Sequence, residues 1–177
     1  LQLKQQAVLF RSSSHSGPLE IELTRRNIPF VKYGGLKFLD AAHVKDMLAL
    51  MRFVENPRDR VSGFRVLQLL PGIGPTSAGR VVEILGASPT PFNALQQSPA
   101  PRGAEGWGDF LALVAELRSG DVGWPAELER ARLWYEPLMD NTYDDAAVRM
   151  LDLHQLAQIA SGYRSREQFL TELTLDP

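Results

Sequence analysis

Apolar residues recur every three or four positions along most of this chain, which is the spacing of helices that pack one face against a core. Two early segments, 7–10 and 28–33, are instead short and mostly apolar runs typical of buried strands. Between them, Ser16 and Pro18 suit the first turn of a short helix that ends near Asn27. The start of the chain therefore predicts a strand–helix–strand unit. Two strands are too few for a stable parallel sheet, so we expect this chain to be an internal piece of a longer protein.

Three further helices are predicted before residue 87. Asp40 suits the cap of a helix that runs to about Glu55, and Asp59 suits the cap of the next one. A Gly-Ile-Gly turn at 72–74 separates that second helix from a third, which ends at Gly86. The apolar positions of the third helix are Ala78, Val81, Val82 and Leu85.

The character of the chain changes at 87–106, where four prolines and few apolar residues predict a linker or long exposed loop. Helical spacing returns from 107 to 177. Its apolar stripes are Trp107, Phe110, Leu111, Val114 and Leu117, then Leu128, Ala131, Trp134, Tyr135 and Leu138, then Val148, Leu151, Leu156 and Ile159. The predicted fold is mainly α, with a short strand–helix–strand unit in domain 1–86, a linker at 87–106, and a helical domain at 107–177.

Composition narrows the function classes. Hydrophobic residues make up 44% of the 177 positions, which is enough for a packed core, and a net charge of −2 argues against a polybasic nucleic-acid binder. The chain has no cysteine and three widely separated histidines, so no metal site is predicted, and His43 is expected at the surface without a role. No apolar run approaches the roughly 18 residues of a membrane span, so no membrane partner is expected.

The turn at 72–74 carries the clearest candidate chemistry. Gly72 and Gly74 permit positive φ and keep side chains away, so the N–H groups that open the next helix are free to face an anion such as a DNA phosphate. Ile73 and Thr76 would then approach a duplex backbone, and Arg80 adds a charge one turn further on. The alternative is a tight turn that binds nothing, since glycine is common wherever two helices meet.

Four blocks between residues 5 and 85 share their order and spacing with one family. They are Ala-Val-Leu-Phe-Arg-Ser-Ser at 7–13, the segment 28–39 with Tyr-Gly-Gly at 33–35, the helix at 41–52, and the Gly-Ile-Gly turn. Together they resemble the UvrD-like, superfamily-one DNA helicases, whose motif IV is similar to 7–13. The turn itself resembles a helix-hairpin-helix motif, which grips nucleic-acid backbone without reading sequence.

The resemblance implies a fragment of a bacterial, cytoplasmic ATP-dependent DNA helicase that translocates on single-stranded DNA and unwinds duplex. Segment 1–86 would be part of the second RecA-like motor domain, and 107–177 would belong to the helical domain inserted into it. ATP and Mg²⁺ are expected in the longer protein and no cofactor in this piece, because its sequence has no Gly-x-x-x-x-Gly-Lys-Ser/Thr loop. The expected partners are single-stranded and duplex DNA and the remaining motor domains.

The resemblance also assigns roles to single residues. Arg11 would contact the γ-phosphate of ATP in a catalytic role, where its planar fork suits phosphate, and Phe10 would stack on the adenine. The residues expected near the DNA path are Gly34, Gly35, Lys37 and Phe38. The alternatives are a surface arginine at Arg11, an ordinary strand residue at Phe10, and a Phe38 ring buried under the next helix.

Two other function classes remain open from the sequence. One is a non-enzymatic DNA-binding module built on the helix-hairpin-helix turn, and the other is a helical domain that binds protein. The second class predicts no salt-dependent affinity for DNA, which separates it from the helicase and from the DNA-binding module.

Overall fold

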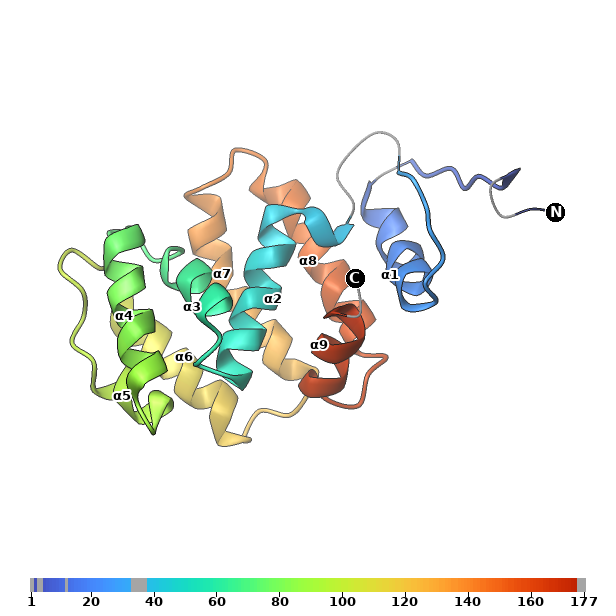
Figure 1. Cartoon of the computed structure of the whole chain (residues 1–177). Helices are drawn as coiled ribbons and strands as arrows, with labels where there is room; N and C mark the ends of the chain where they lie inside the picture. The colour runs from blue at the N-terminus through green and yellow to red at the C-terminus, as the bar shows by residue number, and fades with distance from the viewer. Residues whose placement is uncertain (1, 3–4, 12, 33–37, 175–177) are drawn as a thin grey trace.

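A computed structural model of the protein describes residues 2, 5–11, 13–32 and 38–174. Helices and irregular connections make up this described part, in agreement with a mainly α fold (Figure 1). The elements are η2 (Ser13–Ser16), α1 (Gly17–Arg25), η3 (Phe38–Asp40), α2 (Ala42–Glu55), α3 (Arg60–Leu67), α4 (Pro75–Ala87), α5 (Pro91–Gln97), α6 (Trp107–Ser119), α7 (Ala126–Asp140), α8 (Ala146–Ala160) and α9 (Arg166–Thr174).

The two predicted N-terminal strands are wrong for the described residues. Segments 7–10 and 28–32 are irregular, and Leu9 and Val31 are 93% and 73% exposed. A strand requires a neighbour that completes its hydrogen bonds, and the described part of the chain places no strand beside either segment. The predicted helix between them is confirmed as α1, although the Ser16 hydroxyl bonds to the Glu20 side chain rather than capping the helix.

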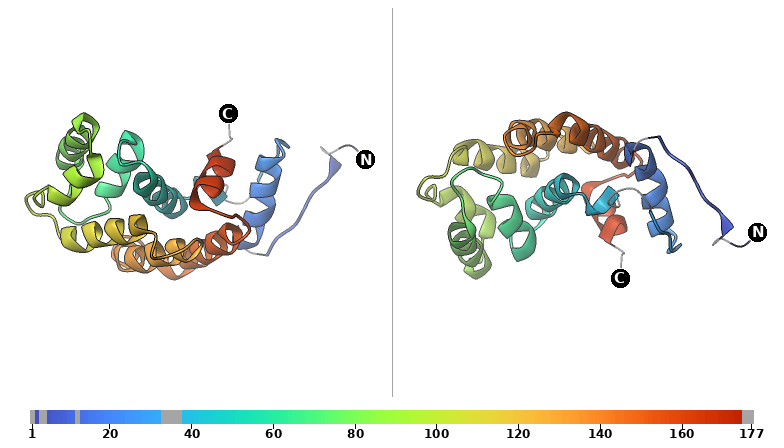
Figure 2. Two further views of the ribbon diagram at one scale, coloured as in Figure 1. Left: turned by 90° about the horizontal axis from the view of Figure 1, so that it is seen from below. Right: turned by 90° about the horizontal axis from the view of Figure 1, so that it is seen from above.

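Helix α2 lies at the centre of the molecule, with α3, α6, α7, α8 and α9 around it (Figures 1 and 2). It is central because its sequence is apolar on almost every side, and Val44, Met51, Phe53 and Val54 are fully buried. The prediction that Asp40 caps this helix is wrong. The N-cap is Ala41, and the Asp40 carboxylate lies 3.1 Å from the Lys45 ammonium instead.

The molecule is elongated, with α4 and α5 at one end and α1 at the other (Figure 2). A single hydrophobic core nonetheless runs from Ile21 to Leu173, across all three predicted segments. Phe110 of α6 is at the centre of an aromatic cluster, because its ring lies within 6.0 Å of the rings of Phe53, Trp107 and Trp134. None of the helices in the described ranges combines the length and apolar character needed to cross a bilayer.

Segment 87–106 differs from the predicted linker or exposed loop, because it contains α5 and packs onto its neighbours. Leu95 is fully buried, and the Trp107 indole N–H donates to the carbonyl of Ser98 at 3.2 Å. Pro91 stands in the first turn of α5, where a proline needs no N–H partner and its fixed φ suits the helix. A residue type that usually signals a loop therefore begins a helix here.

Candidate nucleic-acid interface

The hairpin formed by α3 and α4 is held by local signals and close packing. Asp59 caps α3 as predicted, since its carboxylate accepts from the N–H groups of Val61 and Ser62 at 3.1 Å. Gly63 lets α3 approach its neighbours, because a β-carbon there would lie 3.0 Å from the Phe53 ring and 3.4 Å from Val82. The cap thus defines where α3 begins, and Gly63 brings α3 close to both α2 and α4.

The Gly-Ile-Gly turn itself divides into three distinct positions. Gly72 has a φ of 80°, a left-handed conformation that favours glycine. Ile73 is 5% exposed and anchors the turn in the core, with its N–H donating to the Leu70 carbonyl at 3.1 Å. Gly74 is the N-cap of α4, and a β-carbon there would meet no atom within 4 Å. Only Gly74 leaves open space in front of the helix.

The N-terminus of α4 has no side-chain cap. Its first main-chain hydrogen bond runs from the Ala78 N–H to the Gly74 carbonyl at 3.0 Å, so the N–H groups of Thr76 and Ser77 are left for an outside acceptor. Thr76 and Arg80 are both exposed, and within the described ranges Arg80 forms no ion pair. Free N–H groups, a hydroxyl and a cation together suit a phosphate.

A second segment, 101–106, packs against the turn. The Glu105 N–H donates to the Pro71 carbonyl at 3.0 Å, and a β-carbon added at Gly72 would lie only 1.8 Å from the Gly103 carbonyl oxygen. Gly72 is therefore needed for packing inside the protein as well as for its φ. Sequence reasoning missed this contact, because nothing local to 101–106 shows that it pairs with a turn some thirty residues earlier.

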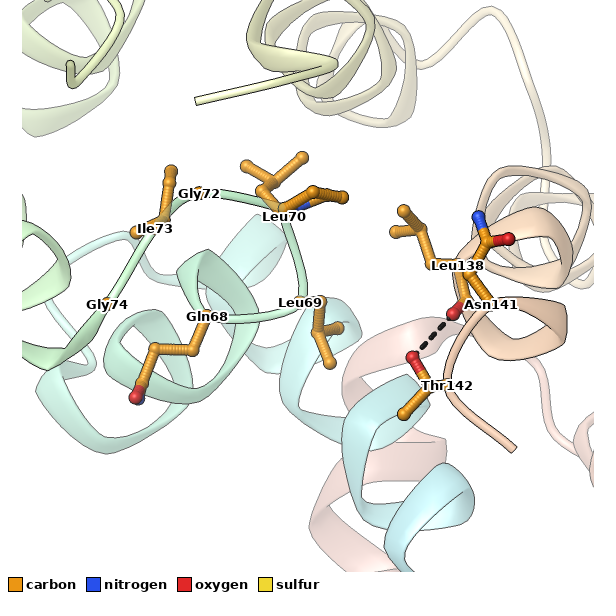
Figure 3. Close-up of a pocket in the computed structure, with 10 residues that line it drawn as sticks. Gln68, Leu69, Leu70, Gly72, Ile73, Gly74, Leu138, Asn141 and Thr142 are labelled. Carbon is orange, nitrogen blue, oxygen red and sulfur yellow. Dashed lines mark hydrogen bonds between the residues drawn. The ribbon is translucent and has the colours of Figure 1, made fainter. Parts of the chain in front are cut away.

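A hollow of about 600 Å³ adjoins the turn. Figure 3 shows Leu69 and Leu70 on its turn side and Leu138, Asn141 and Thr142, from the end of α7, on the other. The Thr142 hydroxyl donates back to the Leu138 carbonyl at 2.7 Å. The hollow thus extends the surface of the turn onto an element about seventy residues further along the chain.

The other predicted site residues lie away from the turn or outside the described residues. Phe10 is 43% exposed and Arg11 is exposed, in the N-terminal segment at the opposite end of the molecule from α4 (Figure 1). Gly34, Gly35 and Lys37 lie outside the described residues. Phe38 is 3% exposed, so it is buried as the alternative predicts and does not face a DNA path. Its ring lies against Gly17 and its N–H donates to Glu20, which places it on the preceding helix α1. The structure therefore brings together Gly72, Ile73, Gly74, Thr76 and Arg80, and the described N-terminal candidates Phe10, Arg11 and Phe38 do not join them.

Comparison with known proteins identifies the class. Residues 1–87 match the UvrD-like helicase C-terminal domain. Through this part the chain belongs to the UvrD-like helicase family. The similarity continues into the helices beyond it, because the ATP-dependent DNA helicase PcrA of Staphylococcus epidermidis is 35% identical over 174 residues, which cover 94% of this chain. PcrA of Staphylococcus aureus is 31% identical over 112 residues, 63% of this chain. The chain spans 23% and 14% of the length of these two relatives.

Proposed function

We propose that this chain is part of an ATP-dependent DNA helicase, in which the α3–turn–α4 hairpin holds the backbone of duplex DNA. The observation that carries the proposal is the uncapped N-terminus of α4 behind Gly74, which offers free N–H groups over open space. The two relatives named as DNA helicases support a nucleic acid as the anion.

In the proposed complex, the N–H groups of Thr76 and Ser77 donate to phosphate oxygens. The Thr76 hydroxyl adds a donor, and the Arg80 guanidinium adds charge one turn along the helix. These groups contact only phosphate, so the grip is independent of base sequence, as an enzyme that moves along DNA requires. Ile73 contributes by fixing the turn in the core rather than by touching DNA.

The second half of the proposal concerns ATP binding by residues of the N-terminal segment. We assign Phe10 to the adenine and Arg11 to the γ-phosphate of ATP, which with Mg²⁺ would bind between this part and the remaining motor domains. Gly34, Gly35 and Lys37 are proposed to face the single strand. Translocation and unwinding belong to the longer protein in this proposal. The division into a motor part at 1–86 and an inserted helical part at 107–177 is proposed with it.

Binding to a duplex with a single-stranded tail tests the DNA half. We expect the affinity of the 177-residue chain, measured by fluorescence anisotropy, to fall steeply between about 50 and 200 mM salt. Gly74→Glu should weaken binding about tenfold or more, because a carboxylate would stand where the phosphate sits. Gly86→Glu is the matched control, since it adds the same charge at an exposed and open position of the same helix, near its far end. Equal affinity in the two variants would contradict the proposal.

The nucleotide half has its own test. Arg11→Ala, made in the longer protein, should nearly abolish ATP turnover and leave DNA binding measurable, because the arginine acts only on phosphate charge. Unchanged turnover would remove Arg11 from the nucleotide site and leave the DNA half of the proposal intact.

A further inference from the structure

The hollow beside the turn combines an apolar floor with polar groups at its rim. Leu69, Leu70 and Leu138 supply the apolar surface, and Asn141 and Thr142 lie at the end of α7 (Figure 3). Its volume of about 600 Å³ falls within the range of small-ligand sites. In the described part of the chain, the side-chain amide of Asn141 has no hydrogen-bond partner, so both its donor and its acceptor are available.

The two ends of the hollow differ in electrostatic character. The turn side adjoins the N-terminus of α4, where free N–H groups favour an anion. The other side is the C-terminus of α7, where carbonyl groups and the exposed Asp140 disfavour an anion and favour hydrogen-bond donors. A nucleotide has the matching polarity, since its phosphate is anionic and its base carries ring N–H or amino donors and a flat apolar face.

We propose that this hollow receives one unpaired base of the DNA strand whose phosphate rests on the turn. This inference rests on the proposed function, because the phosphate must first bind at α4. The base must be unpaired, since a base inside a duplex has its pairing edge occupied and its faces stacked. The occupant is therefore the nucleotide at a junction between duplex and single strand, with its base on the leucine floor and its edge at Asn141.

The test compares two DNAs annealed from separate strands, with the same paired sequence and blunt ends except for a single-stranded tail on one of them. We expect the chain to bind the tailed DNA about tenfold more tightly, the effect of one base on an apolar platform. Thr142→Trp fills the hollow from an exposed rim position and should abolish this preference while leaving affinity for the blunt duplex unchanged. Asn141→Ala leaves the floor intact and should lower the preference about threefold, through the loss of one hydrogen bond.

The matched control is Thr171→Trp, which places the same ring at an exposed position of α9, outside the hollow. It should keep the tenfold preference. No preference in the wild-type chain, or a preference that survives in Thr142→Trp, overturns the inference. In that case the proposed DNA site at the turn would still be supported if Gly74→Glu weakens binding to the blunt duplex. If the wild-type chain shows no salt-dependent binding to either DNA, the proposed function and the inference are both overturned.

Discussion

The hydroxyl of Tyr135 donates a 2.6 Å hydrogen bond to the carboxylate of Asp46, which joins α7 to the central helix. Asp46 is 4% exposed, and its other oxygen accepts from Arg65 of α3 at 2.6 Å. Burial, and then the hydrogen bond to Asp46, raise the pKa of Tyr135 far above its usual range, so the hydroxyl keeps its proton and acts as donor. The buried carboxylate of Asp46 therefore connects α2 to α3, which leads into the Gly-Ile-Gly turn, and to α7, whose C-terminal end lines the hollow.

Tyr135→Phe should destabilise the fold, because it leaves one oxygen of a buried carboxylate without a donor. The expected loss is about 1–3 kcal/mol in the free energy of unfolding, measured by urea titration. Tyr143→Phe is the control, since the described hydrogen bonds do not use the Tyr143 hydroxyl and its ring would stay under Arg149, 4.0 Å away. Equal losses in the two variants would contradict a special role for the Asp46 contact.

The two glycines of the turn should respond differently to alanine. Gly72→Ala places a methyl group at positive φ and against the Gly103 carbonyl, so it should cost about 1–3 kcal/mol and displace segment 101–106. Gly74→Ala adds a methyl group in open space at a φ of −88°, which any residue adopts. It should cost only the lower preference of alanine for the N-cap position, under about 1 kcal/mol. Thermal unfolding measures both. A larger loss at Gly74 than at Gly72 would refute this division.

Helix stripes in the sequence predict burial well where large side chains make the contact. Of the stripe predicted in α6, Trp107, Phe110, Val114 and Leu117 are buried and Leu111 is half-buried. The stripe in α8 is partly wrong, since Val148 and Leu151 are 60% and 53% exposed. The buried face of α8 includes Ala146 and Ala160, because small residues let this helix approach its neighbours. Such a face carries no strong apolar signal.

Contacts between distant segments are the part that sequence reasoning could not supply. His43 was expected at the surface, yet it is 2% exposed, with Nε2 3.0 Å from Asp152 and Nδ1 3.2 Å from Arg149. Its partners lie more than a hundred residues away, so no local pattern pairs them. The candidate site shows the same limit. The two glycines predict the turn. No pattern in the sequence indicates that segment 101–106 and the end of α7 lie beside it.

Helix α1 should weaken in acid through Glu22. Hydrogen bonds from Arg25 and Arg26 lower the pKa of Glu22 to about 2. A carboxyl with a lowered folded-state pKa stabilises the fold above its unfolded pKa, near 4.5, and loses that contribution as pH falls through about 2. We expect NMR signals of α1 to follow the Glu22 titration in this window. Glu22→Gln should remove the transition, and high salt should reduce it, because the pair is exposed to solvent.

Arg166 should stabilise the fold in a pH-dependent way through Glu127. It donates to Glu127 at 2.7 Å, to Glu55 at 2.8 Å and to the Leu117 carbonyl at 3.1 Å, and so ties α9 to three helices. Burial raises the pKa of Glu127, and Arg166 opposes that rise. Arg166→Met keeps the apolar stem and removes the cation, so the pKa of Glu127 should rise further.

The sign of the pH dependence follows from that rise. A carboxyl whose folded-state pKa exceeds its unfolded value, near 4.5, stabilises the fold below 4.5 and loses that contribution as pH rises through the folded-state pKa. Relative to wild type, Arg166→Met should therefore lose more stability at pH 8 than at pH 5, by about 1–3 kcal/mol in urea titrations. Adding Glu127→Gln removes the ionisable group and should abolish the difference between the two pH values. A pH-dependent deficit that persists in the double variant would mean that another group, and not Glu127, responds to the loss of Arg166.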